Sequence, residues 1–117
     1  MGKAIAALAA VLWIGAAHAA PRAESAVECG IAADMAVVAH SLAKEEVQRP
    51  KANQIMARIY DVSESERAQE IMKEILDAAY NTSTAAAGGS GQKFAEDLFT
   101  VCMKSGGDMD TILGKRL

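Results

Sequence analysis

The amino-acid sequence predicts an all-α fold: a compact bundle of about four helices with a short C-terminal turn, closed by one disulfide. Apolar residues recur at three- and four-residue spacing along most of the chain, which is the period of a helix packed on one side. No stretch alternates apolar and polar residues as a half-buried strand does. Serine followed three residues later by glutamate, a signature of a helix N-terminus, occurs at two places.

The first 19 residues have the composition of a secretory signal peptide. Lys3 supplies one positive charge, the apolar segment 4–17 follows, and Ala17 and Ala19 are the small residues that a signal peptidase recognises. A membrane-spanning helix is the alternative, but it needs about 20 apolar residues, and this segment is shorter. We expect a mature domain of residues 20–117 that is not inserted in a membrane and works in the periplasm or outside the cell. The short, alanine-rich signal favours a bacterial host.

The composition of the mature domain argues against two classes of partner. Lys3 is the only charge in the signal, so the mature domain is one unit more negative than the −3 of the whole chain. A mildly acidic chain without a basic block is a poor match for nucleic acid or for an anionic membrane surface. Two tyrosines and two phenylalanines are too few for a surface on which bases stack.

The two cysteines, Cys29 and Cys102, predict one disulfide, as expected for a small exported chain. The bond closes a loop of about 74 residues, for which the chain-entropy model gives a stabilisation of about 4 kcal/mol. Two buried free thiols are the alternative, which an oxidising compartment disfavours. The chain has no Cys-x-x-Cys pair, so a thiol-exchange enzyme is not expected.

The first predicted helix begins at Ser25, whose hydroxyl can accept the N–H of Glu28, and runs to about Val47. Both of its sides are apolar, and a helix of this kind is usually packed on two sides. One side carries Val27, Ile31, Met35, Val38 and Leu42, and the other carries Cys29, Ala33, Ala36 and His40. We therefore place this helix at the centre of the domain.

Two further helices are predicted between residues 49 and 80. Pro50 ends the first helix and suits the first turn of the second, which ends near Asp61. The segment from Ser63 to Glu66 predicts the N-terminus of a third helix that ends near Tyr80. The residues expected to be buried are Ala52, Ile55, Met56, Ile59 and Tyr60 in the second helix and Ala68, Ile71, Met72, Ile75, Leu76 and Ala79 in the third.

A connection rich in Thr, Ser, Ala and Gly covers residues 81–91, and a fourth helix starts near Ser90. Gly106 and Gly107 end this helix, and Asp108 or Asp110 can cap a short helical turn after it. The fourth helix is expected to bury Phe94, Ala95, Leu98, Val101 and Cys102. The predicted disulfide then joins the first full turn of helix one to the last turn of helix four.

Two side chains on the first helix are weak candidates for a binding or catalytic role. His40 is the only histidine of the mature domain, but no coordinating residue follows it at three or four positions, and Cys29 is expected to be oxidised. We expect a half-buried packing histidine. Asp34 is a charge on a largely apolar helix, and three interpretations are open: an ion pair with a base such as Arg58, a seam open to water, or a binding role.

The acidic row Glu66, Glu70 and Glu74 on the third helix could meet a cationic partner or Ca²⁺, but such rows are mostly solvated faces. Asp108 and Asp110 resemble part of a calcium loop without its later glycine and glutamate, so helix capping is expected there. We expect no metal site and no cofactor.

The leading functional hypothesis is a small exported helical protein that binds or stabilises another protein, as exported chaperones, inhibitors and immunity proteins do. The alternative is a carrier of a small apolar ligand, with a pocket lined by Met35, Met72 and Leu98. An enzyme is the third hypothesis, because no serine lies in a Gly-x-Ser-x-Gly motif and no second histidine is present to build another catalytic set.

The exported protein should begin at Ala20 and contain no tryptophan, since Trp13 lies in the predicted signal. Intact mass and near-ultraviolet absorbance of the exported material measure both properties. Tryptophan absorbance in that material would rule out cleavage at this place.

Overall fold

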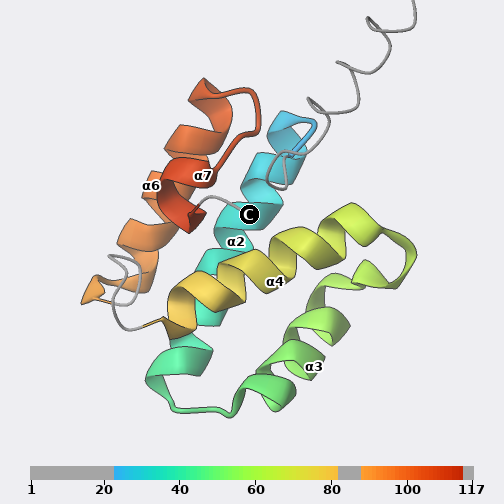
Figure 1. Cartoon of the computed structure of the whole chain (residues 1–117), viewed down its shortest axis with the longest axis vertical. Coiled ribbons are helices and arrows are strands. Elements are labelled where there is room, and N and C mark those ends of the chain that lie inside the picture. The colour runs from blue at the N-terminus through green and yellow to red at the C-terminus, as the bar shows by residue number, and fades with distance from the viewer. Residues whose placement is uncertain (1–22, 82–87, 115–117) are drawn as a thin grey trace, which may run out of the picture.

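The computed structural model describes residues 23–81 and 88–114 of the chain (Figure 1). Its elements, in chain order, are α2 (Ala26–Lys44), α3 (Arg49–Tyr60), the 3-10 turn η1 (Val62–Glu64), α4 (Glu66–Tyr80), α6 (Gly91–Lys104) and α7 (Asp110–Leu113). Within these two ranges there is no strand. The all-α prediction, with its short C-terminal turn, is confirmed. The expected signal peptide lies outside the described residues.

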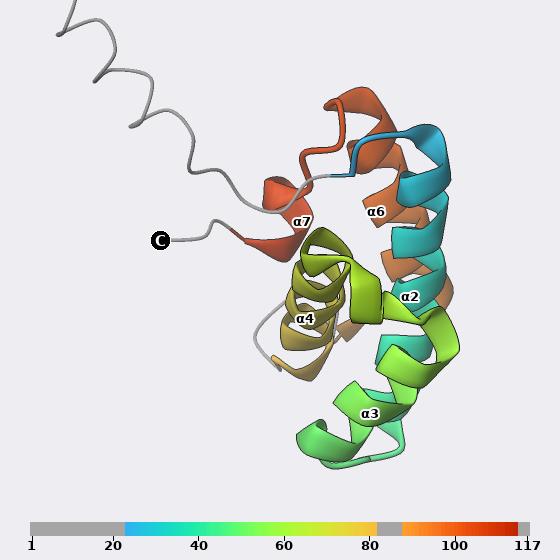
Figure 2. The ribbon, with the colours of Figure 1, turned by 90° about the vertical axis from the view of Figure 1, so that its right-hand side faces the viewer.

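α2 is the helix on which the others pack. It contacts α6, α4 and α3 (Figures 1 and 2), which confirms its predicted central position. Its buried positions are mostly alanine, and small side chains let neighbouring helices approach closely. These positions are Cys29, Ala32, Met35, Ala36 and Ala39. By length and composition alone α2 could cross a membrane; in this fold its apolar residues form the packing surface for three helices.

The apolar side of α2 is only partly covered. Met35 is buried, but Val27 is 71% exposed and Ile31 is 44% exposed, so the prediction that these two are buried is wrong. α4 crosses α2 at an angle instead of running along it (Figure 1), and it leaves the first turns of α2 open on this side. Ile59 of α3 is 55% exposed, also against prediction, because α3 buries only the narrow stripe of Ala52 and Met56.

α2 ends at Lys44, three residues before the predicted end at Val47. Glu46 adopts the left-handed conformation with a φ of 61°, and the N–H of Val47 donates to the carbonyl of Leu42 at 3.0 Å. This arrangement is the Schellman motif, which usually has glycine at the left-handed position. Because glutamate occupies that position here, the sequence carries no glycine to mark the end of the helix.

The second predicted N-cap is displaced by two residues. Val62–Glu64 form the 3-10 turn, and α4 begins only at Glu66. The cap is Ser65 instead of Ser63: its hydroxyl accepts the N–H of Ala68 at 3.1 Å. The serine-to-glutamate spacing therefore located the helix start to within one turn, but it selected the wrong serine.

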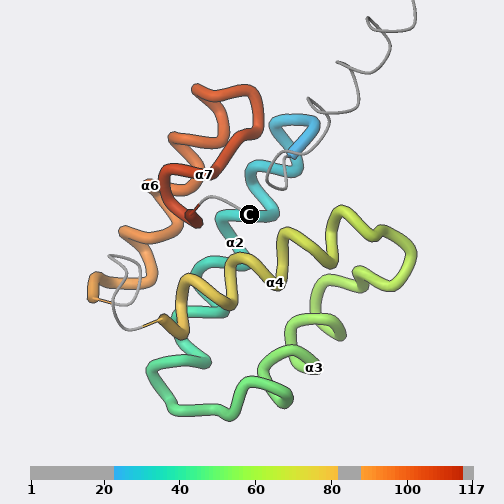
Figure 3. Tube along the Cα trace, viewed as in Figure 1, coloured from blue at the N-terminus to red at the C-terminus, as the bar shows by residue number. Residues whose placement is uncertain are grey.

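Cys29 and Cys102, 73 positions apart in the sequence, form the predicted disulfide, with their Cα atoms 5.7 Å apart. α2 and α6 run in opposite directions (Figure 3), so the bond joins the first turns of α2 to the last turn of α6. Both cysteines are buried. The bond thus fixes the register of the two helices that share the largest contact in the described chain.

The segment that leads into α2 is fastened beside this disulfide. The N–H of Ala23 donates to the carbonyl of Gly107 at 3.1 Å, and the N–H of Gly107 donates to the carbonyl of Cys102 at 2.8 Å. Gly107 has a φ of 94°, and a Cβ atom at this position would lie 1.9 Å from the carbonyl oxygen of Ala23. Only glycine permits both the backbone conformation and this close approach.

Removing the disulfide should strongly destabilise the fold. On the loop-entropy model, Cys29→Ser with Cys102→Ser lowers the free energy of unfolding by about 4 kcal/mol, out of a total of about 5–15 kcal/mol for a domain. The thermal midpoint, followed by circular dichroism, should then fall by about 15 °C or more. Wild-type protein treated with a reductant is the control for the introduced hydroxyls. An unchanged midpoint in both samples would remove the stabilising role assigned to the bond.

Candidate functional site

A small apolar hollow lies between α2 and α4 and has a volume of about 220 Å³. We call it the α2–α4 hollow. It is lined by Glu28, Ile31, Ala32 and Met35 from α2 and by Ser65, Arg67, Ala68 and Ile71 from the start of α4 and its cap. Ala32, Met35 and Ile71 are buried and form an apolar floor, while Ile31 is at the lip. Val27 lies one turn before Ile31 on α2, so it extends the apolar lip outward.

A charged group closes one edge of the hollow. The guanidinium of Arg67 lies 2.6 Å from the carboxylate of Glu28 and 3.3 Å from that of Glu24. The hydrogen bond from Arg67 holds the pKa of Glu28 below its ordinary value. Because Glu24 and Glu28 share one guanidinium, this edge keeps an excess of negative charge.

Glu28 also closes the first turn of α2. The hydroxyl of Ser25 accepts the N–H of Glu28 at 3.2 Å, as the capping box predicts. The Glu28 carboxylate turns back and accepts the N–H of Glu24 at 2.7 Å, one residue before the cap. The same side chain therefore stabilises the helix start and positions Arg67 at the edge of the hollow.

Asp34 lies on α2 three residues beyond Ile31 and is exposed. The hydroxyl of Tyr60 donates to its carboxylate at 2.5 Å, which connects the end of α3 to α2. Asp34 is thus hydrogen-bonded to a tyrosine and not paired with Arg58. Because Asp34 is exposed, it fits the interpretation of a charged residue at a helix boundary open to water. Burial, and then the bond to Asp34, raise the pKa of Tyr60 well above its ordinary value.

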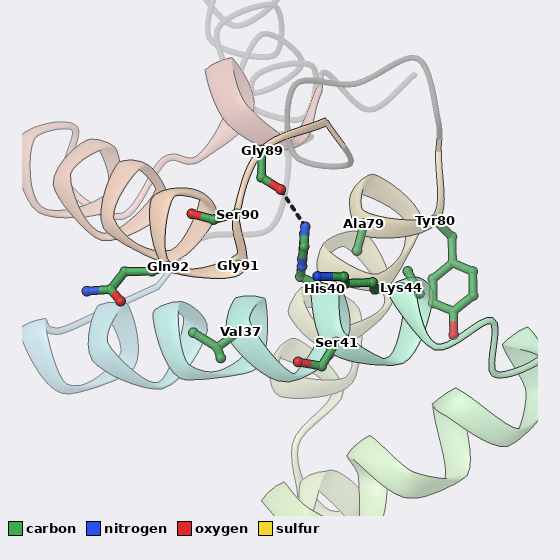
Figure 4. Close-up of a pocket in the computed structure, with 11 residues that line it drawn as sticks. Val37, His40, Ser41, Lys44, Ala79, Tyr80, Gly89, Ser90, Gly91 and Gln92 are labelled. Atoms are coloured by element: carbon green, nitrogen blue, oxygen red, sulfur yellow. Dashed lines mark hydrogen bonds between the residues drawn. The ribbon is translucent and has the colours of Figure 1, made fainter.

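A larger and more polar hollow, of about 630 Å³, lies between the C-terminal half of α2, the end of α4 and the start of α6 (Figure 4). His40 is half-buried here, and its Nε2 is 2.7 Å from the carbonyl oxygen of Gly89. A Cβ atom on Gly91 would lie 3.3 Å from His40 Nδ1, so the imidazole packs closely against the first residue of α6. In this position His40 fastens the start of α6 to α2.

The other polar groups of the hollow around His40 also serve the fold. The hydroxyl of Tyr80 donates to the carbonyl of Val47 at 2.6 Å. The hydroxyl of Ser90 accepts the N–H of Lys93 at 3.0 Å and caps α6. Lys44 is the one lysine or arginine among the residues that line this hollow. The hollow around His40 is therefore a junction of three elements whose polar groups bond mostly to backbone.

The acidic candidates do not gather into a metal site. Glu66 is exposed, and Glu70 and Glu74 are half-buried along α4. Among residues 23–81 and 88–114, no group of three or more His, Cys, Asp or Glu side chains is placed to hold a metal ion. The side chain of Asp108 accepts the N–H of Asp110, the first residue of α7, at 2.9 Å. The N-cap residue of α7 is Met109, which makes no side-chain cap bond, so neither aspartate is the cap that the sequence predicts.

The structure keeps the two weak candidates on α2 apart: Asp34 contacts α3, whereas His40 contacts the start of α6. The α2–α4 hollow, with Ile31 and Arg67, was not predicted. Arg67 and Glu28 are 39 positions apart, and no local pattern connects them. No protein-family model, curated protein or solved structure matches this chain. A function has to follow from the chemistry of its own surface.

Both tyrosines should ionise late in the folded protein. Burial raises the pKa of Tyr60 and of Tyr80, and Asp34 raises that of Tyr60 further. A phenol whose pKa is higher in the folded than in the unfolded protein stabilises the fold while it is neutral. This stabilisation is complete below about pH 10 and is lost as the pH rises through the pKa of the folded state. Tyrosinate absorbance should therefore stay low at about pH 10 in native protein and reach half its maximum in urea-unfolded protein.

The variants Tyr60→Phe and Tyr80→Phe each leave one tyrosine, so they show at which pH each phenol ionises. Circular dichroism on the same samples confirms that the protein is still folded. Half-ionisation of the native protein near the ordinary tyrosine value of about 10 would contradict the Asp34–Tyr60 contact.

Proposed function

We propose that this chain is an exported helical binding protein that holds a partner polypeptide by one apolar side chain inserted in the α2–α4 hollow. The disulfide and the apolar N-terminal segment fit an exported protein. The observation that carries the proposal is the hollow itself, with a buried apolar floor, an exposed apolar lip and charge confined to its edge.

The volume of the hollow favours a side chain over a larger molecule. A water molecule occupies about 30 Å³ in the liquid, so 220 Å³ has room for about seven waters. Pockets for drug-sized ligands are larger, about 300–1,000 Å³. One leucine, methionine or phenylalanine side chain is of the size that the hollow accepts.

The surroundings of the hollow match the energetics of a protein interface. Binding energy at interfaces is concentrated in a few apolar anchors that fill pockets, with neighbouring contacts that exclude water. Val27 and Ile31 provide such an apolar border, and the Glu28–Arg67 pair provides a polar rim. Covering Ile31 and Val27 also removes apolar surface that the fold leaves in water.

A carrier of a small apolar ligand is the second candidate, supported by the same apolar floor. The carrier hypothesis expected a pocket between helices one, three and four, lined by Met35, Met72 and Leu98. The α2–α4 hollow is a different space: Met35 lines it, but Met72 and Leu98 do not. A ligand confined to 220 Å³ would have to be much smaller than a fatty acid or a lipid. The volume therefore favours the protein-binding proposal.

A photo-reactive phenylalanine analogue placed at Ile31 should crosslink to a polypeptide in the cell envelope or medium of the native host. Ile59 is the matched control, because it is also an exposed isoleucine on a helix but lies on α3. Ala68→Met, which fills the hollow, should reduce the crosslink from position 31 at least tenfold, whereas Thr100→Met, which adds the same side chain at an exposed position of α6, should leave it unchanged.

Equal crosslinking from positions 31 and 59, or a crosslink that survives Ala68→Met, would overturn the proposal. Crosslinking only from Phe99, an exposed aromatic on α6, would place the interface on another face. A small-molecule mass that accompanies the native protein and is lost in Ala68→Met would instead favour the carrier.

A further inference from the structure

We infer that α3 is a hinged cover, which opens and closes as one unit on α2 and α4 while the rest of the bundle stays folded. The inference does not depend on the α2–α4 hollow, because it concerns how the domain moves. It follows from the small buried face of α3, the contacts at its two ends and the backbone on either side of it.

α3 has the fewest buried residues of the four longer helices in the described chain, and it lies at one end of the bundle (Figures 1 and 2). Two of its twelve residues are buried, Ala52 and Met56, with Ala57 and Tyr60 half-buried beside them. α4, which has fifteen residues, buries six. Because burial of apolar area is the main force that holds a helix on a core, α3 opens at a smaller cost in free energy than unfolding of the whole domain.

Polar contacts to exposed carboxylates hold both ends of α3. At its first residue, the guanidinium of Arg49 lies 2.7 Å from the carboxylate of Asp77 and donates to the carbonyl of Lys73 at 3.2 Å. At its last residue, Tyr60 donates to Asp34 of α2. Both carboxylates are exposed, so water can take the place of these contacts when α3 leaves.

The chain is anchored to α4 just outside both ends of α3. Before the helix, the carbonyl of Val47 accepts the hydroxyl of Tyr80 at 2.6 Å. After the helix, the carbonyl of Val62 accepts the side-chain amide of Gln69 at 3.0 Å. The segment that moves is therefore limited to residues 48–61, and the two anchors stay in place when it opens.

The residues between these anchors and α3 can serve as hinges. Gln48 is the N-cap residue and makes no side-chain cap bond. Asp61 is the C-cap residue and has the left-handed conformation, with a φ of 49°. Hinges are usually a few terminal residues of an element that absorb the change in φ and ψ. Rotation at Gln48 and Asp61 lifts α3 and exposes the apolar faces of α2 and α4 on which it packs.

Trypsin acting on the native, disulfide-bonded protein tests the inference. A helix of twelve residues is only marginally stable in water once it leaves its neighbours, so the open state offers α3 to the protease. Lys51 and Arg58 are exposed sites within α3, and Lys73, an exposed lysine within α4, is the matched control. Cleavage in α3 should be at least about tenfold faster than after Lys73, with each rate divided by that of the same bond in the reduced chain in urea. The cut chain stays joined through Cys29 and Cys102, so intact mass detects it as the addition of water.

Two variants separate the opening of α3 from unfolding of the whole domain. Tyr60→Phe removes the contact to Asp34 and should speed both α3 cleavages about two- to tenfold. Ala95→Gly places a glycine inside α6, which should make global unfolding about fivefold more frequent and leave the α3 cleavages unchanged. Hydrogen exchange of the buried amides of α2 measures the increase in global unfolding.

Four outcomes would overturn the inference. Equal normalised rates at Lys51, Arg58 and Lys73 would show that all three are cut only after global unfolding. Cleavage after Lys51 alone would show fraying of the first turn and not opening as a unit. The same holds if the α3 cleavages accelerate in Ala95→Gly by the factor measured for α2. An unchanged rate in Tyr60→Phe would show that α3 is cut without breaking its contact to α2.

Discussion

The packing of α6 on α2, fixed by the Cys29–Cys102 bond, is the constraint on which the rest of the structure depends. α2 presents mainly alanine to its neighbours, and an alanine side chain buries little apolar area. The helices gain contact by close approach instead, which needs a correct register along their whole length. The disulfide supplies that register at one end of the pair, and His40 contacts the start of α6 at the other.

The α2–α4 hollow follows from the same use of small residues. Ala32 of α2 and Ala68 of α4 line it together with the larger Ile31, Met35 and Ile71. Small residues at a crossing leave space that the larger neighbours enclose without filling. Because Glu28 both closes the first turn of α2 and holds Arg67 at the edge, the shape of the hollow depends on the stability of that helix start.

The sequence predicted the features that depend on local signals. The helix start at Ser25, the disulfide and the central position of α2 could be predicted because capping and periodicity act within one helix and the chain has only two cysteines. The exposure of Val27 and Ile31 could not, since periodicity identifies an apolar side but not how far a crossing helix covers it. The candidate site was missed for the same reason, because it exists only where two helices cross.

The two hollows differ in what an occupant would displace, and this difference decides which is the better binding site. Around His40, polar groups from three elements line the space, and an occupant would have to replace their contacts with water. The floor of the α2–α4 hollow has no polar side chain, so an apolar side chain can enter it without leaving a buried polar group unsatisfied. The charges at its edge stay in contact with water, where an ion pair with a partner needs little desolvation. Volume alone would favour the hollow around His40, but the chemistry of the walls favours the smaller one.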